Sequence, residues 1–329
     1  MVTLKDLAIE LGVNVSTVSR ALNGSGGISE DMVQKVRSKA EERGYSLRRR
    51  GGLGRSDLNA AGIVVPEVSS EYYARLVHLA KNKLKEEGYS SIVIVSDFRT
   101  ADTIEAIHIF GKIHVKCLLI VMDTEEDMSE EILRSLRRIN LPIMLITPKY
   151  YPLLEFDCIH LDEYSGIIMG IQHLKDRGYQ RIGCIGDRLS ANRVTIFRQA
   201  LKLLEMGYDP KLVFIGSERA ERGGYLRTKE ALSQRNRPDA IFCCYDQIAV
   251  GAICAIEEYQ LHIPDEIAVL GFDDLSVSTY LAGGITTIAN ASEEMISIAV
   301  NVLAKRIRNT ESVPQQIALR PKLVIRSTT

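Results

Sequence analysis

The sequence predicts an all-α headpiece of three short helices, followed by an α/β domain with two lobes and parallel sheets. Three observations predict this fold class. Residues 1–45 carry apolar residues at helical spacing, with capping residues between the helices. Residues 46–60 are rich in arginine and glycine and indicate a linker. Residues 61–329 alternate apolar, strand-like runs with amphipathic segments. We therefore expect a headpiece over 1–45, a basic, glycine-rich linker over 46–60 and a two-lobed domain over 61–329.

The headpiece has clear helix starts. Thr3 and Asp6 have the spacing of a capping box. Asn14 is placed to cap a second helix over residues 15–22, and Ser29 is placed to cap a third. Two helices joined by a short turn and braced by a third form a helix-turn-helix. The side chains expected on the inner faces are Leu4, Leu7, Ala8, Leu11, Val18, Leu22, Val33, Val36 and Ala40.

The remainder of the chain has the pattern of parallel sheets. Continuous apolar runs cover residues 62–66, 91–95, 117–122, 143–147, 182–185, 213–215, 240–244 and 267–272. Helical patterns lie between most of them, over residues 73–87, 130–139, 165–177, 193–206, 221–233 and 246–259. Hydrophobic strands that alternate with amphipathic helices indicate parallel sheets covered on both faces. The number of strand–helix units exceeds what one such domain usually holds, so two α/β lobes are expected.

Composition bounds the function. The chain has 329 residues, 46% of them hydrophobic and 25% charged, with a formal net charge of −1. Basic charge gathers at one end, because residues 43–55 include five arginines and no acid. This asymmetry points to a polyanion that only the amino-terminal end contacts. The start of the sequence does not resemble a signal peptide, and no apolar run is long enough to span a membrane, so a cytoplasmic location is expected.

Signatures of catalysis are missing from the sequence. It has no GxSxG, HExxH or P-loop motif, and no GxGxxG motif after a strand. Its six histidines lack metal-ligand spacing. Its six cysteines lie in apolar stretches without a CxxC pair, which indicates buried free thiols. We expect no enzymatic activity, no metal and no cofactor.

Several blocks of sequence carry a family resemblance. The headpiece contains LKDLA, STVSRALNG and ISE, and it closes on GY. Farther along come GIVVP, HLKDRGYQRIGCIG at 173–186, AIFCCYDQIAVGA at 240–252 and IPDEIAVLGFDD at 263–274. In this order the blocks resemble the lactose/galactose repressor (LacI/GalR) family of transcriptional regulators. The resemblance implies a sequence-specific DNA-binding regulator of metabolic genes, expected to be a repressor. A small effector, expected to be a sugar or sugar derivative, would bind between two lobes of the type I periplasmic-binding-protein fold.

The second helix is the expected reading element for DNA. Val15 and Ser16 stand where such helices touch base edges in the major groove, and Arg20 is placed to fork onto a guanine. A second interpretation is that the polar residues of this segment form only a solvated helix face. By the resemblance, the residues that hydrogen-bond phosphates are Thr3, Thr17, Ser19 and Asn23, and Leu4 completes the set of DNA-contacting residues in the headpiece.

The linker departs from the family pattern. Relatives carry a hinge helix whose leucine wedges into the minor groove. Here that position falls on Gly54, and Leu53 is one residue away. Three glycines between residues 51 and 54 disfavour a helix by about 0.5–1 kcal/mol each relative to alanine. We expect Leu53 and the three arginines Arg48, Arg49 and Arg50 to contact DNA, with the arginines supplying most of the attraction.

The resemblance also implies an effector site at the carboxyl ends of the strands. It assigns one lobe to residues 59–158 with a helix over 292–308, and the other to residues 159–288 with a terminal strand over 323–325. Alternatives are that Tyr72 or Tyr73 is only a core residue, and that Asp246 only caps its helix. The expected effector contacts are Tyr72, Tyr73, Arg193, Arg219, Tyr245 and Asp273.

Three further expectations concern ligands and partners. Four arginines, Arg188, Arg193, Arg219 and Arg222, fall in segments that could border the cleft, which suggests an acidic or phosphorylated sugar. One headpiece buries too little surface for specific binding, so a homodimer on an inverted-repeat DNA operator is expected. The alternative functions are a solute-binding protein or an enzyme of sugar metabolism without a regulatory role.

Overall fold

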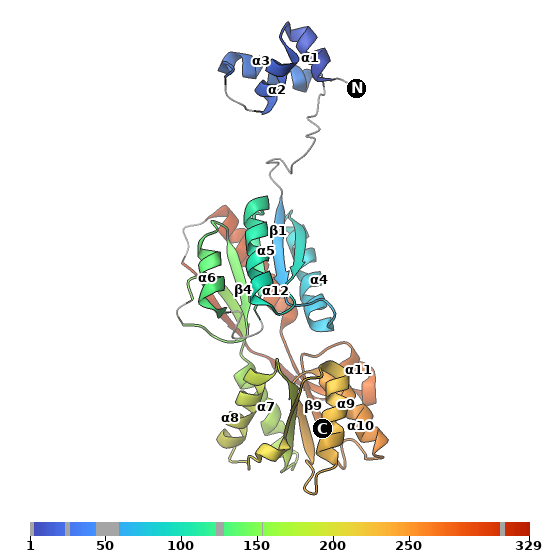
Figure 1. Ribbon diagram of the computed structural model, residues 1–329. Helices are drawn as coiled ribbons and strands as arrows, with labels where there is room; N and C mark the ends of the chain where they lie inside the picture. Colours follow the sequence, from blue (N-terminus) through green and yellow to red (C-terminus); the bar gives the residue numbers. More distant parts are fainter. Residues whose placement is uncertain (1–2, 24–26, 44–58, 123–127, 153, 310–312) are drawn as a thin grey trace. The chain divides into compact units, whose positions relative to one another are not determined.

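The computed structural model describes residues 3–23, 27–43, 59–122, 128–152, 154–309 and 313–329. The chain divides into two compact units, Met1–Ser56 and Asp57–Thr329. The first is the helical headpiece, and the second holds two α/β lobes (Figure 1).

The described part of the headpiece forms the three predicted helices, α1 (Leu4–Leu11), α2 (Val15–Asn23) and α3 (Glu30–Glu42). The capping box at the start of α1 is confirmed. The Asp6 N–H donates to Thr3 Oγ1 at 3.3 Å, and the Thr3 N–H donates to Asp6 Oδ2 at 2.8 Å. Packing between the helices buries a small apolar core of Leu7, Ala8, Val18, Ala21, Val36 and Ala40.

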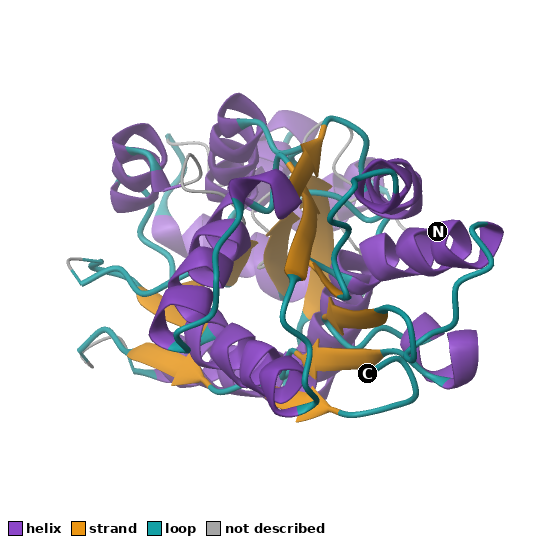
Figure 2. Ribbon diagram, turned by 90° about the horizontal axis from the view of Figure 1, so that it is seen from below, coloured by secondary structure: helices purple, strands orange, loops and turns teal. Residues whose placement is uncertain are grey.

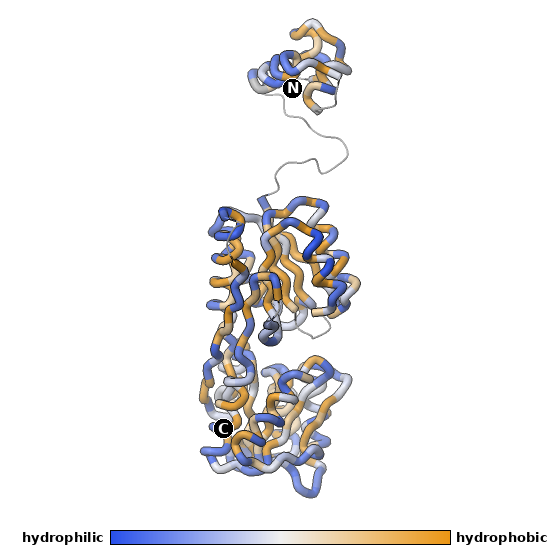
Figure 3. Tube along the Cα trace, turned by 90° about the vertical axis from the view of Figure 1, so that its left-hand side faces the viewer, coloured by the Kyte–Doolittle hydropathy of each residue, from blue (hydrophilic) through white to orange (hydrophobic). Residues whose placement is uncertain are grey.

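The first lobe is built on a sheet whose described strands all run parallel, in the order β11-β5-β4-β3-β1-β2. These strands are β1 (Ala60–Val65), β2 (Ser90–Val95), β3 (Cys117–Val121), β4 (Ile143–Thr147), β5 (Asp157–Leu161) and β11 (Gln316–Leu319). Its helices are α4 (Glu71–Glu86), α5 (Thr100–Ile113), α6 (Glu130–Arg137) and α12 (Ser292–Arg308). Figure 3 shows that the strands of this lobe are largely hydrophobic along their length.

The second lobe has the strand order β12-β10-β9-β8-β6-β7, in which β12 alone of the described strands runs antiparallel. The strands are β6 (Ile182–Asp187), β7 (Val213–Gly216), β8 (Ala240–Cys243), β9 (Ala268–Phe272), β10 (Thr286–Ala289) and β12 (Lys322–Val324). The longer helices are α7 (Glu163–Asp176), α8 (Ala191–Leu203), α9 (Ala220–Leu232) and α10 (Asp246–Glu258), with a short α11 (Val277–Tyr280). Figure 2 shows helices around the strands of the domain, as alternation of strand and helix predicts.

Within the described residues, the chain passes between the lobes at three places. These are the segment after β5, the segment after β10, and the segment from β11 to β12. The predicted fold class, a helix-turn-helix unit followed by two lobes with mostly parallel sheets, is confirmed.

Several details of the prediction are wrong. The first crossing follows Leu161 and not Cys158, so residues 159–161 belong to the first lobe. Strand β11 was not predicted, and the terminal strand is Lys322–Val324. Helix α5 was also missed, because its four isoleucines favour strands and obscure the helical spacing of its buried residues. Of the six cysteines, Cys254 is exposed on α10, so the expectation of buried thiols fails there.

Candidate DNA interface and ligand cleft

Helix α2 separates an apolar inner face from a polar outer face. Val18 and Ala21 are fully buried, whereas Ser16 and Arg20 are exposed one helical turn apart. Val15 begins the helix with 43% of its surface exposed, although it is apolar. These three residues therefore form an accessible surface at the start and along one side of the helix, suited to reading base edges.

The other predicted DNA contacts lie around this surface. Thr17 and Ser19 are half-buried on α2, and Asn23 is its last residue. Thr3 is exposed, while Leu4 is half-buried against the headpiece core. The four predicted contacts of the linker, Arg48, Arg49, Arg50 and Leu53, lie outside the described residues.

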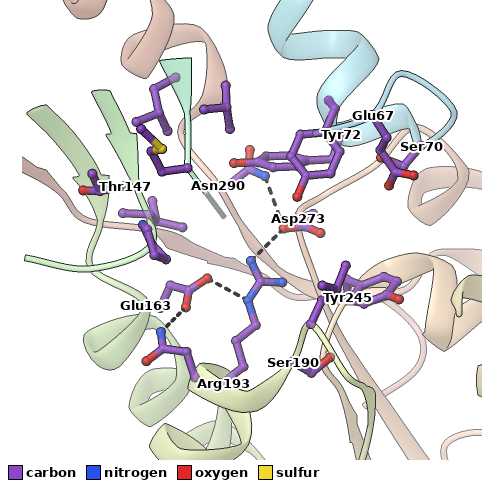
Figure 4. Close-up of a pocket in the computed structure, with 18 of the residues that line it drawn as sticks. Glu67, Ser70, Tyr72, Thr147, Glu163, Ser190, Arg193, Tyr245, Asp273 and Asn290 are labelled. Atoms are coloured by element: carbon purple, nitrogen blue, oxygen red, sulfur yellow. Dashed lines mark hydrogen bonds and ion pairs between the residues drawn. The ribbon is translucent and has the colours of Figure 1, made fainter. Parts of the chain in front are cut away.

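The two lobes enclose a cleft with about 920 Å³ of empty space, including its open mouth. All six predicted effector contacts line it, as the close-up in Figure 4 shows in part. Other polar residues that line the cleft were not predicted from the sequence. These are Glu67, Ser70, Thr147, Glu163, Ser190, Asn192, Gln247 and Asn290. Several of them follow directly on a strand, and this position at the carboxyl ends of parallel strands was the signal that could have found them.

Arg193 is the centre of the cleft's polar network. Its Nε donates to Glu163 Oε1 at 2.7 Å, and its Nη1 donates to the Cys244 carbonyl at 2.6 Å. Its Nη2 lies 3.4 Å from Asp273 Oδ1 (Figure 4). The guanidinium lies over the Phe272 ring, 3.9 Å from the ring centroid. Two carboxylates that are largely shielded from solvent, and a carbonyl, therefore surround this cation.

Asp273 reaches the cleft from the turn after β9, with a left-handed φ of 101°. Its Oδ1 accepts from Asn290 Nδ2 at 3.3 Å and from Arg193 at 3.4 Å, both long contacts. Burial raises the pKa of this carboxyl group, against the lowering effect of Arg193. The carboxylate thus retains accepting capacity for a donor such as a ligand hydroxyl.

Arg219 lies at the mouth of the cleft, directly before α9. Its Nη1 and Nη2 donate to the Glu67 carboxylate at 3.2 and 2.9 Å, and its Nε is 3.5 Å from Asp187 Oδ2. Burial alone would raise the pKa of Glu67, but hydrogen bonds from Arg219 and Ser69 bring it below its ordinary value. Burial would likewise lower the pKa of Arg219, yet Glu67 raises it.

The aromatic lining residues have partners within the protein. The Tyr245 hydroxyl donates to Asp187, and burial followed by this carboxylate raises the tyrosine pKa. Tyr73 is 5% exposed and packs edge-on against Phe98, so it belongs to the core as well as to the wall of the cleft. Tyr72 is half-buried, with its ring 5.0 Å from that of Tyr73.

The alternative that Asp246 only caps its helix is wrong, because the N-cap of α10 is Tyr245. Asp246 is fully buried and accepts from the Leu275 N–H at 2.9 Å, Ser278 Oγ at 2.5 Å and Thr287 Oγ1 at 2.7 Å. A Cβ at Gly271 would lie only 2.1 Å from Asp246 Oδ1, so this contact requires glycine there. Burial raises the pKa of Asp246 to about 7. The residue anchors the segment that follows Asp273.

The expectation that four arginines border the cleft is wrong for two of them. Arg188 is exposed outside the lining, and Arg222 is 76% exposed and paired with Glu218. The two arginines that do line the cleft are both engaged by carboxylates of the protein. An anionic ligand would therefore have to displace carboxylates that already hold these cations.

None of the described helices is long and apolar enough to cross a membrane. Among the described residues, no group of three or more histidine, cysteine, aspartate or glutamate side chains is arranged to hold a metal ion.

A helix-turn-helix unit with an exposed polar helix, joined in one chain to a two-lobed domain with a polar cleft, defines a class of ligand-controlled DNA-binding proteins. Comparison with known proteins agrees with this class. Residues 3–46 match the family described as "Bacterial regulatory proteins, lacI family", and residues 171–329 match the "Periplasmic binding protein-like domain". The headpiece is thus a lacI-family DNA-binding domain, joined to a periplasmic-binding-protein-like domain, and the chain is a DNA-binding transcriptional regulator and not an enzyme.

Individual relatives match along the whole chain. The HTH-type transcriptional repressor PurR of Haemophilus influenzae (strain ATCC 51907 / DSM 11121 / KW20 / Rd) is 27% identical over 337 residues, which cover 99% of this chain and 98% of that protein. A structure titled "transcriptional regulator CelR-cellobiose complex" has a TM-score of 0.73 at 23% identity and covers 100% of both chains. The lac repressor dimer bound to operator and the anti-inducer ONPF has a TM-score of 0.75 at 23% identity, covering 99% of this chain and 98% of that one. The two structural likenesses show the fold.

Proposed function

We propose that this chain is a cytoplasmic, homodimeric repressor that binds an inverted-repeat operator and is controlled by an uncharged, sugar-like effector. In this proposal residues 1–45 read DNA, residues 46–60 link the units, and residues 61–329 bind effector and dimerise. The observation that carries the effector part is that both cations lining the cleft, Arg193 and Arg219, are already held by carboxylates of the protein.

The exposed surface of α2 supports the DNA-reading role. Arg20 would donate two hydrogen bonds to a guanine, while Val15 and Ser16 would meet neighbouring base edges. Thr3, Leu4, Thr17, Ser19 and Asn23 would fix the register on the backbone of the duplex without reading sequence. Arg48, Arg49, Arg50 and Leu53 would add contacts from the linker.

The polar lining supports an uncharged effector with several hydroxyl groups. Hydroxyls both donate and accept, so they suit a cleft in which carboxylates, amides and guanidinium groups alternate. Asp273 and Arg193 are the proposed central contacts. Tyr72 and Tyr73 would face the apolar side of a sugar ring, while Arg219 and Tyr245 border the mouth. A relative with this fold is titled as a complex with cellobiose, a neutral sugar.

The proposed dimer follows from the size of the reading unit. A single module of this size buries too little surface to be specific at physiological salt, so two must act together. The fold relative titled as a dimer bound to operator has this arrangement.

Selection of bound duplexes from a random pool, using the full chain, tests the proposal. We expect an inverted repeat, and a sedimenting dimer that binds it much more tightly than it binds one half-site. A monomer that selects no sequence, or binds one half-site equally tightly, would contradict the proposal. Sugar binding without any selected duplex would favour a solute-binding protein instead.

A further inference from the structure

The two lobes contact each other through polar groups at the mouth of the cleft. Glu67 lies in the first lobe, between β1 and α4, and Arg219 lies in the second lobe, directly before α9. We name these two residues the mouth pair. Their two hydrogen bonds, at 2.9 and 3.2 Å, give the bidentate geometry that makes guanidinium–carboxylate pairs strong.

Each member of the mouth pair is held in place by its own lobe. Ser69 Oγ donates to Glu67 Oε2 at 2.8 Å in the first lobe. In the second lobe, Asp187 Oδ2 lies 3.5 Å from Arg219 Nε, and Tyr245 fixes Asp187. The side chains of Glu67 and Arg219 are 14% and 31% exposed, so solvent screens them less than it screens a surface pair.

A cation–π contact is a second interaction between the lobes. Phe98 of the first lobe lies 5.0 Å from the Arg219 guanidinium and also packs on Tyr73 in the wall of the cleft. It is presented by a turn in which both Asp97 and Phe98 have left-handed φ values, 49° and 56°. Such a turn is uncommon for residues other than glycine, and here it brings the ring under the cation.

Loss of either charge has a predictable consequence. Without Arg219, the carboxylates of Glu67 and Asp187 would face each other across the mouth and repel. Without Glu67, the cation would remain with Asp187 in its own lobe, and no ion pair would join the lobes at this edge. Both changes favour separation of the lobes.

We propose that the mouth pair is a latch that holds the lobes together in the ligand-free protein and so sets how far an effector can shift them. Glu67 and Arg219 are then positioning residues for the effector site, and this consequence rests on the proposed function. Arg219 Nε is buried and lies 3.5 Å from Asp187, so the hydrogen bonds of the latch are made by the two terminal nitrogens, Nη1 and Nη2.

A distance measurement between the lobes tests the latch without DNA or effector. Cys254 is exposed on α10 of the second lobe, and the other five cysteines are buried. A Glu105→Cys substitution adds a second exposed site, on α5 of the first lobe. Energy transfer between donor and acceptor dyes on these two sites reports the distance between the lobes in the full chain. The labelled protein is diluted into unlabelled protein, so that transfer between protomers does not contribute.

We expect Glu67→Gln and Arg219→Gln each to raise the population of the open form about tenfold, the effect of losing a bidentate, partly buried pair. The double variant should open no further than the more open single variant. Arg219→Lys, which keeps the charge and loses the fork, should lie between native and Arg219→Gln. High salt should open the native protein and leave the double variant unchanged.

Lys229→Gln is the matched control, because Lys229 and Glu258 form a 2.7 Å ion pair within the second lobe. The latch is refuted if Glu67→Gln and Arg219→Lys, in folded protein, leave the distance unchanged, or if Lys229→Gln opens the lobes equally. Because neither DNA nor effector enters the measurement, failure of the latch is distinguishable from failure of the proposed regulator.

Discussion

The headpiece and the cleft differ in how far their polar side chains are exposed to solvent. The headpiece has a small apolar core and leaves Ser16 and Arg20 exposed on α2. The cleft withdraws Arg193 and Asp273 from solvent and pairs their charges within the protein. The two regions therefore suit different kinds of ligand. An exposed arginine can contact the phosphates or base acceptors of DNA directly, whereas a cleft whose arginines are already held by carboxylates disfavours an anionic ligand.

The largest expected effect comes from removing the cation at the centre of the cleft's polar network, Arg193. Arg193→Ala leaves the carboxylates of Glu163 and Asp273 without their cation in a largely buried site. We expect a loss of about 3–5 kcal/mol from the unfolding free energy of the two-lobed domain. Denaturant unfolding measures it, and Arg222→Ala, at an exposed pair, is the control. Equal stability of the two variants would contradict the claim that Arg193 stabilises the carboxylates of Glu163 and Asp273.

The headpiece should depend on its few buried side chains. Leu7→Ala removes a fully buried residue from a small core, at a cost of about 2–5 kcal/mol. Since small units have little stability to lose, the headpiece should unfold and duplex binding should vanish while the two-lobed domain keeps its own transition. Calorimetry and duplex titration test this together. Ile9→Ala, on the same helix at 71% exposure, should change neither result.

Base reading should be sensitive to single residues of α2. Arg20→Ala is expected to lose about 1–3 kcal/mol of binding free energy and to relax preference at one base pair in each half-site. Thr17→Ala should weaken binding evenly across sequences. Competition against duplexes changed one pair at a time separates the two outcomes. An equal loss of affinity for every duplex in Arg20→Ala would show that Arg20 contacts the DNA backbone and not a base.

The smallest effect concerns Asp246 and pH. Burial raises the pKa of its carboxyl group in the folded protein to about 7, from an ordinary value of about 3.9. The folded state therefore binds a proton that the unfolded state releases, so stability from this group is present at low pH and is lost as pH rises from about 4 to 7. As pH falls from about 8 to about 6, the unfolding free energy of the native protein should rise by about 1.4 kcal/mol relative to that of Asp246→Asn.

The comparison with Asp246→Asn also separates this group from two histidines. Burial lowers the pKa of His160 and His173, so their contribution is lost as pH falls and runs the opposite way. Both proteins share these histidines, so the difference in unfolding free energy between the two reports Asp246. A difference that does not vary with pH would refute the buried carboxyl as its source.

The sequence allowed much more of the headpiece to be predicted than of the cleft. The Thr3 cap and the outward residues of α2 lie close together in the chain, where local spacing determines structure. The six residues predicted to contact an effector all line the cleft. Their partners were not predicted, because Glu67 and Glu163 come from distant segments and look like ordinary solvated acids in sequence.

The same reason explains the errors in the two-lobed domain. Strand β11 is short and partly polar, and its pairing with β5 joins residues far apart in the chain. Arg188 and Arg222 have the same sequence character as Arg193 and Arg219, and only the fold decides which pair faces the cleft. Long-range pairing of charges is therefore the part that local sequence patterns do not encode.

The most direct test of the account compares ligands that differ only in charge. Neutral sugars, each beside its own phosphate and its own sugar acid, are titrated into the full chain on its selected duplex, and both ligand affinity and duplex affinity are recorded. The account predicts that a neutral sugar binds, changes duplex affinity, and loses both effects in Arg193→Lys, while its charged derivatives bind more weakly. Tighter binding of the phosphate or acid, or a filled cleft that leaves duplex affinity unchanged, would contradict it.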